Sequence, residues 1–301
     1  MDGQLRFQVL TLPGRPWAEY RTQVLHTEEL GFDVAAIPDH FCDWANPPAY
    51  WLECWSLMAA LAVETTTIRL ATNVSQIPLR HPGVLAHQAV TVDQISNGRI
   101  ELGIGTGLTI DPGTEMIGLE NWSNGERARR FGEYLELLGL LLSQDVTTYE
   151  GEYYSAQDAV MQPSSVQRPR LPLVAAALGP KMMRHTARFA DAWNTMSFSP
   201  DFGAQIDELV ERQQRMNDLC VELDRNPSTL GRSVNLFDAE ARAAGGRIRY
   251  YDDEQLFVHL VTSLRDAGYG DIGLYYPSEP DQLDAFEHLA RDVIPEFQAG
   301  R

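Results

Sequence analysis

A histidine that follows an aspartate at the end of an apolar run is the pair of residues best suited to chemistry. Asp39 and His40 come directly after the run DVAAIP at 33–38. An imidazole can exchange a proton with a substrate hydroxyl near neutral pH, and a neighbouring carboxylate can accept a hydrogen bond from a ligand ring. Loop histidines also often cap backbone groups, so these two residues alone leave a catalytic and a structural role equally open.

Three tryptophans follow closely along the chain, at Trp44, Trp51 and Trp55. Clustered aromatic side chains near a polar pair can form the wall of a site for a flat ring. They can equally pack beneath the loop as part of the core, which is the commoner role of such residues.

Glycines alternate in the stretch ELGIGTGLT, at Gly103, Gly105 and Gly107. A residue without a side chain lets the backbone approach a ligand closely. The stretch has no GxGxxG pattern that leads directly into a helix, so a nicotinamide-binding Rossmann domain is disfavoured.

A possible anion site lies at 179–182, between an apolar run at 173–177 and a helical pattern. Pro180 suits the first turn of a helix, and Gly179 precedes it. The exposed amides of this turn, together with Lys181 and next to Met182, predict a site for a phosphate group.

The elements that must position these residues alternate between short apolar runs and helical patterns. Expected helices include 17–30, 51–63, 83–96 and 126–142, and the aromatic stretch that follows the last of these predicts a small hairpin inserted after the fourth helix. The expected strands are 7–12, 33–38, 68–74, 100–105, 173–177, 192–196, 233–237 and 272–276.

Eight strand–helix units in 301 residues predict a single (β/α)8 barrel domain over residues 1–301, although an open doubly wound sheet would show the same local alternation. The active site of such a barrel is built from loops at the carboxyl ends of its strands. The polar and glycine-rich groups described above all follow strands, so we expect them to meet at one end.

Composition excludes several classes of function. The formal charge of −18 would repel a phosphate backbone, so nucleic acid is excluded as a main partner. No apolar run suits a signal peptide or a membrane span, and we expect a soluble, cytoplasmic protein. Cys42, Cys54 and Cys220 lack a CxxC or Cys/His spacing, so neither a disulfide framework nor a metal site is predicted.

Four stretches, in this order, resemble the luciferase-like monooxygenase superfamily and specifically its coenzyme F420-dependent oxidoreductases. They are PDHF at 38–41, ETTTIRLATNV at 64–74, RHPGVLAHQAVTVDQISNGRIELGIGTG at 80–107 and GPKMMRHTARFADAWN at 179–194. The resemblance implies a barrel that is usually a homodimer. It also implies a deazaflavin or flavin ring at the carboxyl-terminal mouth, with the phosphate near the loop after the fifth strand.

The same resemblance implies roles for individual residues. Asp39 would touch the ring, His40 would transfer a proton, and Trp44 would stabilise the reacting centre. A cis peptide bond would join Asn73 to Val74. The remaining ring and phosphate contacts would come from Asn73, Val74, Gln76, Thr106, Gly107, Gly179, Pro180, Lys181 and Met182.

One position departs from the sugar-phosphate dehydrogenases of that family. Leu108 stands where they carry a glutamate after the glycines. A leucine cannot move a proton, so oxidation of glucose 6-phosphate by the same mechanism is disfavoured.

Two enzymatic functions and one non-enzymatic function fit these patterns. The first is hydride transfer between C5 of coenzyme F420 and a small organic substrate, and the alternative is a monooxygenase that uses reduced FMN and O2. A barrel that has lost its cofactor is the third. The substrate would be selected by loops 41–50, 106–124 and 237–252, which match no motif.

Overall fold

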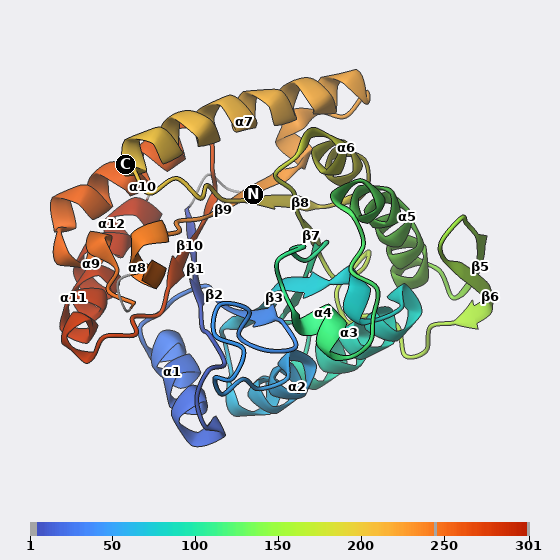
Figure 1. Ribbon diagram of the computed structural model, residues 1–301, viewed down its shortest axis with the longest axis horizontal. Coiled ribbons are helices and arrows are strands. Elements are labelled where there is room, and N and C mark those ends of the chain that lie inside the picture. Colours follow the sequence, from blue (N-terminus) through green and yellow to red (C-terminus); the bar gives the residue numbers. More distant parts are fainter. Residues whose placement is uncertain (1–4, 244–245, 300–301) are drawn as a thin grey trace.

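The computed structural model describes residues 5–243 and 246–299. Eight parallel strands close into a barrel in the order β1-β10-β9-β8-β7-β4-β3-β2, which confirms the predicted (β/α)8 architecture (Figure 1). The barrel strands are β1 (Arg6–Leu10), β2 (Val34–Asp39), β3 (Arg69–Gln76), β4 (Ile100–Gly105), β7 (Leu173–Ala176), β8 (Ala192–Thr195), β9 (Gly231–Asn235) and β10 (Asp271–Tyr275).

Helices follow each strand and form the outer ring. They are α1 (Trp17–Glu29), α2 (Cys54–Glu64), α3 (Pro82–Ser96), α4 (Gly113–Met116), α5 (Asn124–Ser143), α6 (Pro180–Phe189), α7 (Phe202–Glu222), α8 (Ala239–Ala243), α9 (Arg249–Asp252), α10 (Glu254–Asp266), α11 (Leu283–His288) and α12 (Ile294–Gln298). Short 3-10 turns lie at Ile77–Leu79, Pro227–Thr229 and Pro280–Gln282, and a π-helical turn at Leu289–Val293 joins α11 to α12. No helix in the described ranges combines the length and the apolar composition that crossing a bilayer requires.

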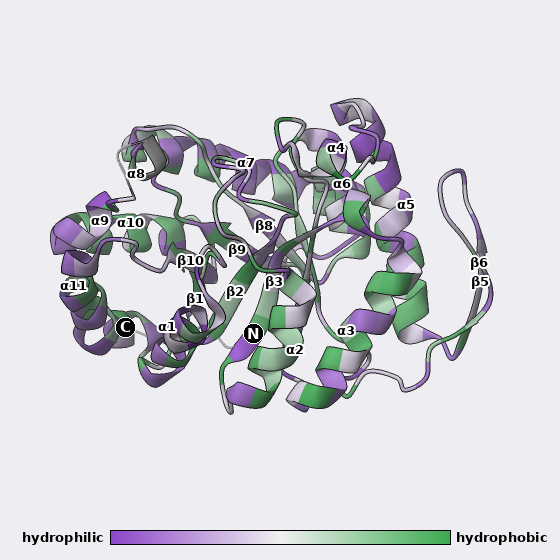
Figure 2. Ribbon diagram, turned by 60° about the horizontal axis from the view of Figure 1, so that its bottom comes forward, coloured by the Kyte–Doolittle hydropathy of each residue, from purple (hydrophilic) through white to green (hydrophobic). Residues whose placement is uncertain are grey.

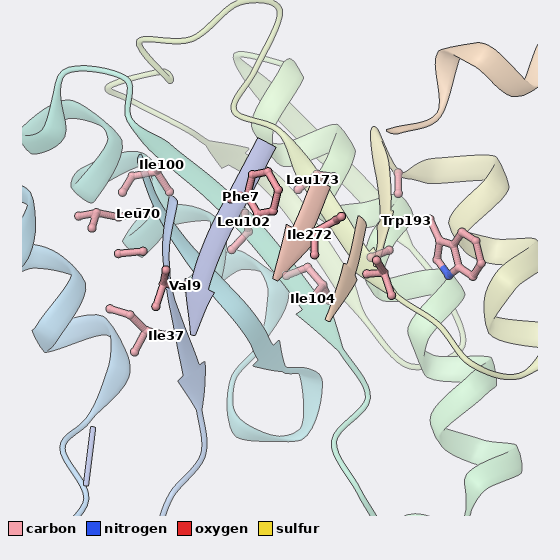
Figure 3. Packing of buried hydrophobic residues seen from close by; sticks show 14 of the residues in the cluster. Phe7, Val9, Ile37, Leu70, Ile100, Leu102, Ile104, Leu173, Trp193 and Ile272 are labelled. Atoms are coloured by element: carbon pink, nitrogen blue, oxygen red, sulfur yellow. The ribbon is translucent and has the colours of Figure 1, made fainter. Parts of the chain in front are cut away.

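The main core lies between the barrel wall and this ring of helices. Outward-facing side chains of consecutive strands, among them Phe7, Ile37, Leu102 and Ile272, are completely buried in it (Figure 3). Burial of one such side chain contributes roughly 1.5–3 kcal/mol, which explains why the apolar runs located the strands correctly. The observed start of one strand differs from the predicted start. β9 begins at Gly231, two residues earlier than expected, because Gly231 and Arg232 pair with Ala192 and Trp193 of β8.

The predicted insertion is a two-stranded antiparallel hairpin of β5 (Val146–Glu150) and β6 (Ser155–Val160) after α5. Both views show this hairpin beside α5 and away from the barrel strands (Figures 1 and 2). The insertion therefore leaves the barrel closed and lies outside its mouth.

Candidate active site

Irregular pairing at the carboxyl ends of β2, β3 and β4 shapes one side of the mouth. The register shifts between Ile37 and Asp39 and again between Ala71 and Ser75, and the Asn73–Val74 peptide bond is cis, as the resemblance implied. Such irregularities redirect side chains at strand ends. Here they place the end of β2 and the middle of β3 at the expected ring site.

The glycine at 105 serves this irregular segment. A Cβ atom at Gly105 would lie 2.3 Å from Cγ2 of Val74, so only glycine lets β4 pass the Asn73–Val74 segment. Our interpretation of this glycine as room for a ligand is therefore wrong, because Val74 occupies the space. Gly107 has a positive φ of 70°, and a side chain there would collide with Gln76.

His40 is held by two polar side chains from neighbouring strand ends. Its Nδ1 lies 2.6 Å from Oδ2 of Asp111 and 2.8 Å from Nε2 of Gln76, and Gln76 also donates to Asp111 at 3.1 Å. Nδ1–H donates to the Asp111 carboxylate, and the Gln76 amide donates to the same carboxylate, so the approach of Gln76 to Nδ1 is a contact between two donors and not a hydrogen bond. Both contacts of the ring go to Nδ1, so Nε2 is the nitrogen left to exchange a proton with a substrate.

Asp111 is the partner that the sequence analysis missed. Burial alone would raise the pKa of Asp111, but hydrogen bonds from His40, the Gly113 amide and Gln76 lower it below the ordinary value. The carboxylate is thus ionised at neutral pH and orients the imidazole. A turn in which the Asp111 amide donates to the Leu108 carbonyl at 3.1 Å returns the chain toward His40, so an acid reaches this region although position 108 is leucine.

Two tryptophans of the expected cluster take different places. The Trp51 indole donates to the His40 carbonyl at 3.1 Å, and its ring meets the imidazole edge to face at 6.1 Å. Trp55 is buried and donates to the Ser75 hydroxyl at 3.1 Å, which is the packing role. Trp44 is half-buried in the loop after β2, and its expected contact with the reacting centre stays a prediction.

Asp39 is buried beneath the mouth. Its carboxylate is only 1% exposed and forms a two-pronged ion pair with Arg80, which also contacts Glu53 at 3.2 Å. Burial raises the pKa of Asp39 above its ordinary value, and the Arg80 guanidinium opposes that rise. A direct contact between Asp39 and a ring stays a prediction.

The loop after β4 meets the start of α6. Thr106 donates to the Gly107 carbonyl at 3.2 Å and approaches the Met182 sulfur at 3.8 Å. Arg127 of α5 donates to the carbonyl oxygens of Thr106 and Trp122 and so fixes the loop from behind. Residues expected at the ring and residues expected at the phosphate therefore form one continuous surface.

The start of α6 has the properties of an anion site. Gly179 is the N-cap residue without a side-chain cap, and a Cβ atom there would meet open space. Lys181 is exposed, is paired with none of the described residues, and is the only lysine of the sequence. Trp193 donates to the Ala177 carbonyl at 2.8 Å and anchors the loop that leads into this helix.

Comparison with known proteins supports the family that these features indicate. Residues 4–224 match the family model of luciferase-like monooxygenases. The chain belongs to this family.

Three individual matches extend the comparison. An F420-dependent glucose-6-phosphate dehydrogenase of Microbacterium testaceum is 32% identical over 171 residues, 56% of this chain and 50% of the relative, so the chain spans half the length of that relative. A relative of the same name from Intrasporangium calvum is 26% identical over 317 residues, 91% of this chain and 94% of that protein. The F420-dependent tetrahydromethanopterin reductase of Methanopyrus kandleri shares the fold, with a TM-score of 0.78, 20% identity and coverage of 98% and 99%.

Inside this luciferase-like barrel, the Asn73 side chain belongs to a layer of amides. Asn73 and Asn235 exchange hydrogen bonds of 3.1 and 3.2 Å, and Asn73 also donates to Gln8 at 3.3 Å. Asn194 joins the layer through Asn235 at 3.2 Å. The Asn73 side chain thus points into the barrel, and its expected contact with a ring would have to come from its backbone.

A cavity of about 790 Å³ lies toward the opposite end of this luciferase-like barrel. Its lining includes Arg6, Glu101 and Asp271 from the amino-terminal ends of strands and reaches Asn73 and Val74. The charges there are paired: Arg6 and Arg69 contact Glu101 at 2.7 and 2.5 Å. Because functional groups of these barrels gather at carboxyl ends, we place the reaction at the mouth, not in this cavity.

Proposed function

We propose that this protein is a coenzyme F420-dependent oxidoreductase that transfers a hydride between the cofactor and a small organic substrate. The observation that carries the proposal is the His40–Asp111–Gln76 group, which joins the end of β2 to the end of β3 and to the loop after β4. A proton-exchanging residue beside a ring site is what a hydride transfer requires, because substrate oxidation releases a proton together with the hydride.

The residues of this chain would divide the work as follows. F420, when bound, supplies a ring carbon that accepts or donates the hydride. Nε2 of His40 takes the hydroxyl proton of an alcohol during oxidation, or returns it during reduction. Asp111 is a positioning residue, because it holds the imidazole in one tautomer and stabilises its protonated form. In this proposal Trp44 lies near His40 and stabilises the reacting centre.

The cofactor would lie across the β3, β4 and β7 side of the mouth. Val74, Gln76, Thr106 and Gly107 would border its ring together with Asp39 and the Asn73 backbone. Its phosphate would lie on the first turn of α6, where the free amides near Gly179 and Pro180, next to Met182, and the unpaired charge of Lys181 favour an anion.

The alternative is an FMN-dependent monooxygenase of the same family, since the barrel can hold either ring. Titration of the protein with reduced F420 and with reduced FMN separates the two. Binding of F420 at low micromolar concentration with weaker binding of FMN supports the proposal, and the reverse order supports the monooxygenase.

We further propose that the protein is a homodimer. A groove between α2 and α3 has both apolar residues, among them Ala59 and Val84, and polar residues in its lining, and the same two helices carry Val63 and Ile95, which are 75% and 44% exposed. Apolar side chains gathered on adjacent helices favour association. Light scattering at micromolar concentration should give twice the mass of the 33.7 kDa chain, and a monomer would contradict the proposal.

We also propose a cytoplasmic location. All three cysteines are buried and free, a pattern that suits a reducing compartment. Fractionation of the cells that make the protein, followed by detection with an antibody, tests this.

A further inference from the structure

Three aromatic side chains lie in a row at the carboxyl ends of β8, β9 and β10, which are consecutive strands of the barrel. Phe198 follows β8, Phe237 follows β9, and Tyr275 ends β10. The rings of Phe198 and Phe237 lie 5.6 Å apart at 70°, and those of Phe237 and Tyr275 lie 5.9 Å apart at 58°. We call these three residues the aromatic wall.

Tyr275 joins the aromatic wall to the inside of the barrel. Tyr275 packs against the inward-facing layer of Leu10, Val34, Ala36 and Ala71 from β1, β2 and β3. These strands include the one that His40 follows. Phe198, at the other end of the wall, is 47% exposed, which is unusual for a phenylalanine that already packs on another ring.

Two polar clamps hold the loops of Phe198 and Phe237 together. Gln205, which is 1% exposed, donates to the Ser199 carbonyl at 2.6 Å and to the Phe237 carbonyl at 2.9 Å. Arg249 donates to Asp238 at 2.8 Å and to the Pro200 carbonyl at 2.9 Å. The wall is therefore built before any ligand arrives, which lowers the entropic cost of binding.

The arginines near the aromatic wall are neutralised by ion pairs. Arg249 is neutralised by Asp238 and by Glu240 at 3.0 Å, and Arg212 by Glu208. Arg247 is bound by Asp252 and Asp281 at 2.6 and 2.7 Å. Recognition of a phosphate depends on cations that are free to donate to it, and the described arginines that reach these loops are already paired.

We propose that the aromatic wall binds the flat, uncharged aromatic or conjugated body of the substrate and that this enzyme does not act on a sugar phosphate. This inference rests on the proposed function, because it specifies the substrate of the same site. Ring-on-ring contact and burial of an apolar body would supply the binding energy. His40 would face the reacting polar end.

The test compares an aromatic enone, benzylideneacetone, with a small enone, 3-penten-2-one, and with glucose 6-phosphate. The full-length protein with F420 is assayed as the parent and as Phe198→Ala, Phe237→Ala and Phe198→Leu. Reduction of either enone adds a hydride from reduced F420 and one proton to the double bond, and oxidation of the sugar phosphate runs the transfer in the other direction.

We expect benzylideneacetone to be preferred by the parent. Each alanine variant should raise its KM about tenfold, and Phe198→Leu should raise it less because leucine keeps the apolar contact without the ring. KM for 3-penten-2-one and the affinity for F420 should change less than twofold.

Calorimetry of benzylideneacetone binding to the protein without cofactor tests the aromatic wall separately from the proposed F420-dependent activity. No turnover is possible there, so loss of binding in the alanine variants supports the wall even if F420 proves not to bind. Equal effects of the variants on both enones would overturn the proposal.

Preference for glucose 6-phosphate would overturn it as well. Arg15, in the loop after β1, has no ion pair among the described residues, and a loss of that activity in Arg15→Ala would then identify the phosphate contact.

Discussion

At the carboxyl-terminal end of the barrel the carboxylate of Asp111 holds an imidazole, whereas at the amino-terminal end Glu101 and Asp271 face arginines. The amino-terminal end has a cavity of about 790 Å³, but the charges that line it neutralise each other. The mouth has a histidine with one nitrogen left for a substrate. We therefore propose the mouth as the site because of the groups at its strand ends, and not because of a cavity. Changes at the mouth should alter turnover, and changes at the base should alter stability.

The largest effect is expected for His40. Replacement by glutamine, which can still bond to Asp111 but cannot exchange a proton, should lower turnover about 10²- to 10⁴-fold with unchanged affinity for F420. Steady-state kinetics and a fluorescence titration with F420 measure the two quantities. His40→Ala should give the same loss of turnover. A glutamine variant within threefold of the parent would reduce His40 to a scaffold residue.

Asp111→Asn should have the next largest effect. An amide cannot stabilise the imidazolium, so kcat should fall about 10- to 100-fold. Asp111→Glu keeps the charge and should recover part of the loss. If Asp111→Asn lowers only the melting temperature and leaves kcat unchanged, Asp111 is structural.

The difference between His40 and Asp111 shows what the sequence could and could not predict. His40 lies directly after a buried strand, so the fold alone places it at the mouth. Asp111 lies 71 residues further along, in a loop, and reaches His40 through a turn that no apolar pattern predicts. The DPG sequence at 111–113 was a usable signal, since Asp111 accepts the Gly113 amide at 2.8 Å in a local turn.

The barrel could be predicted more completely than the site. Burial of strands leaves apolar runs in the sequence, whereas hydrogen bonds and ion pairs between distant polar residues leave no such pattern. All residues of β2 and β4 are buried, and these strands appeared as apolar runs. The ion pair of Asp39 with Arg80 and the amide layer around Asn73 join polar residues far apart in the chain. The sequence alone therefore did not indicate that Asp39 is paired with Arg80 or that the Asn73 side chain points into the barrel.

At the base of the barrel, Asp271→Asn should change stability without changing turnover. Burial, opposed by Arg6, raises the pKa of Asp271 to about 7, against about 3.9 for an unfolded aspartate. The folded protein therefore holds the proton more tightly, and the stability from this group is complete below about pH 4 and is lost as the pH rises through about 7.

Urea unfolding at pH 5 and pH 8 measures this effect. From pH 5 to pH 8, the free energy of unfolding of the parent should fall by about 1–2 kcal/mol more than that of Asp271→Asn. This is a part of the roughly 4 kcal/mol that corresponds to the full difference between the folded and unfolded pKa values. The side chain is 17% exposed to the cavity, so water reduces the effect. A twofold or larger change in kcat would contradict the separation of the two ends.

The smallest effect is expected at Lys181. Lys181→Ala should weaken F420 binding about five- to tenfold, because an exposed cation at a helix start adds modestly to the amides. Lys181→Arg should bind like the parent, and Gly179→Asp should weaken binding further by repulsion. Unchanged dissociation constants in both Lys181→Ala and Gly179→Asp would show that the phosphate lies elsewhere.

Lys181 is the only lysine among the 24 basic residues of this chain. The protein therefore has a single ε-amino group, and that group lies on α6 at the predicted phosphate site. Acylation of lysine, whether by a metabolite or by a coupling reagent, therefore removes a positive charge from this helix and leaves all other side chains unchanged. The protein should thus be attached to a support through an engineered cysteine, since coupling through its amine would block the mouth it is meant to present.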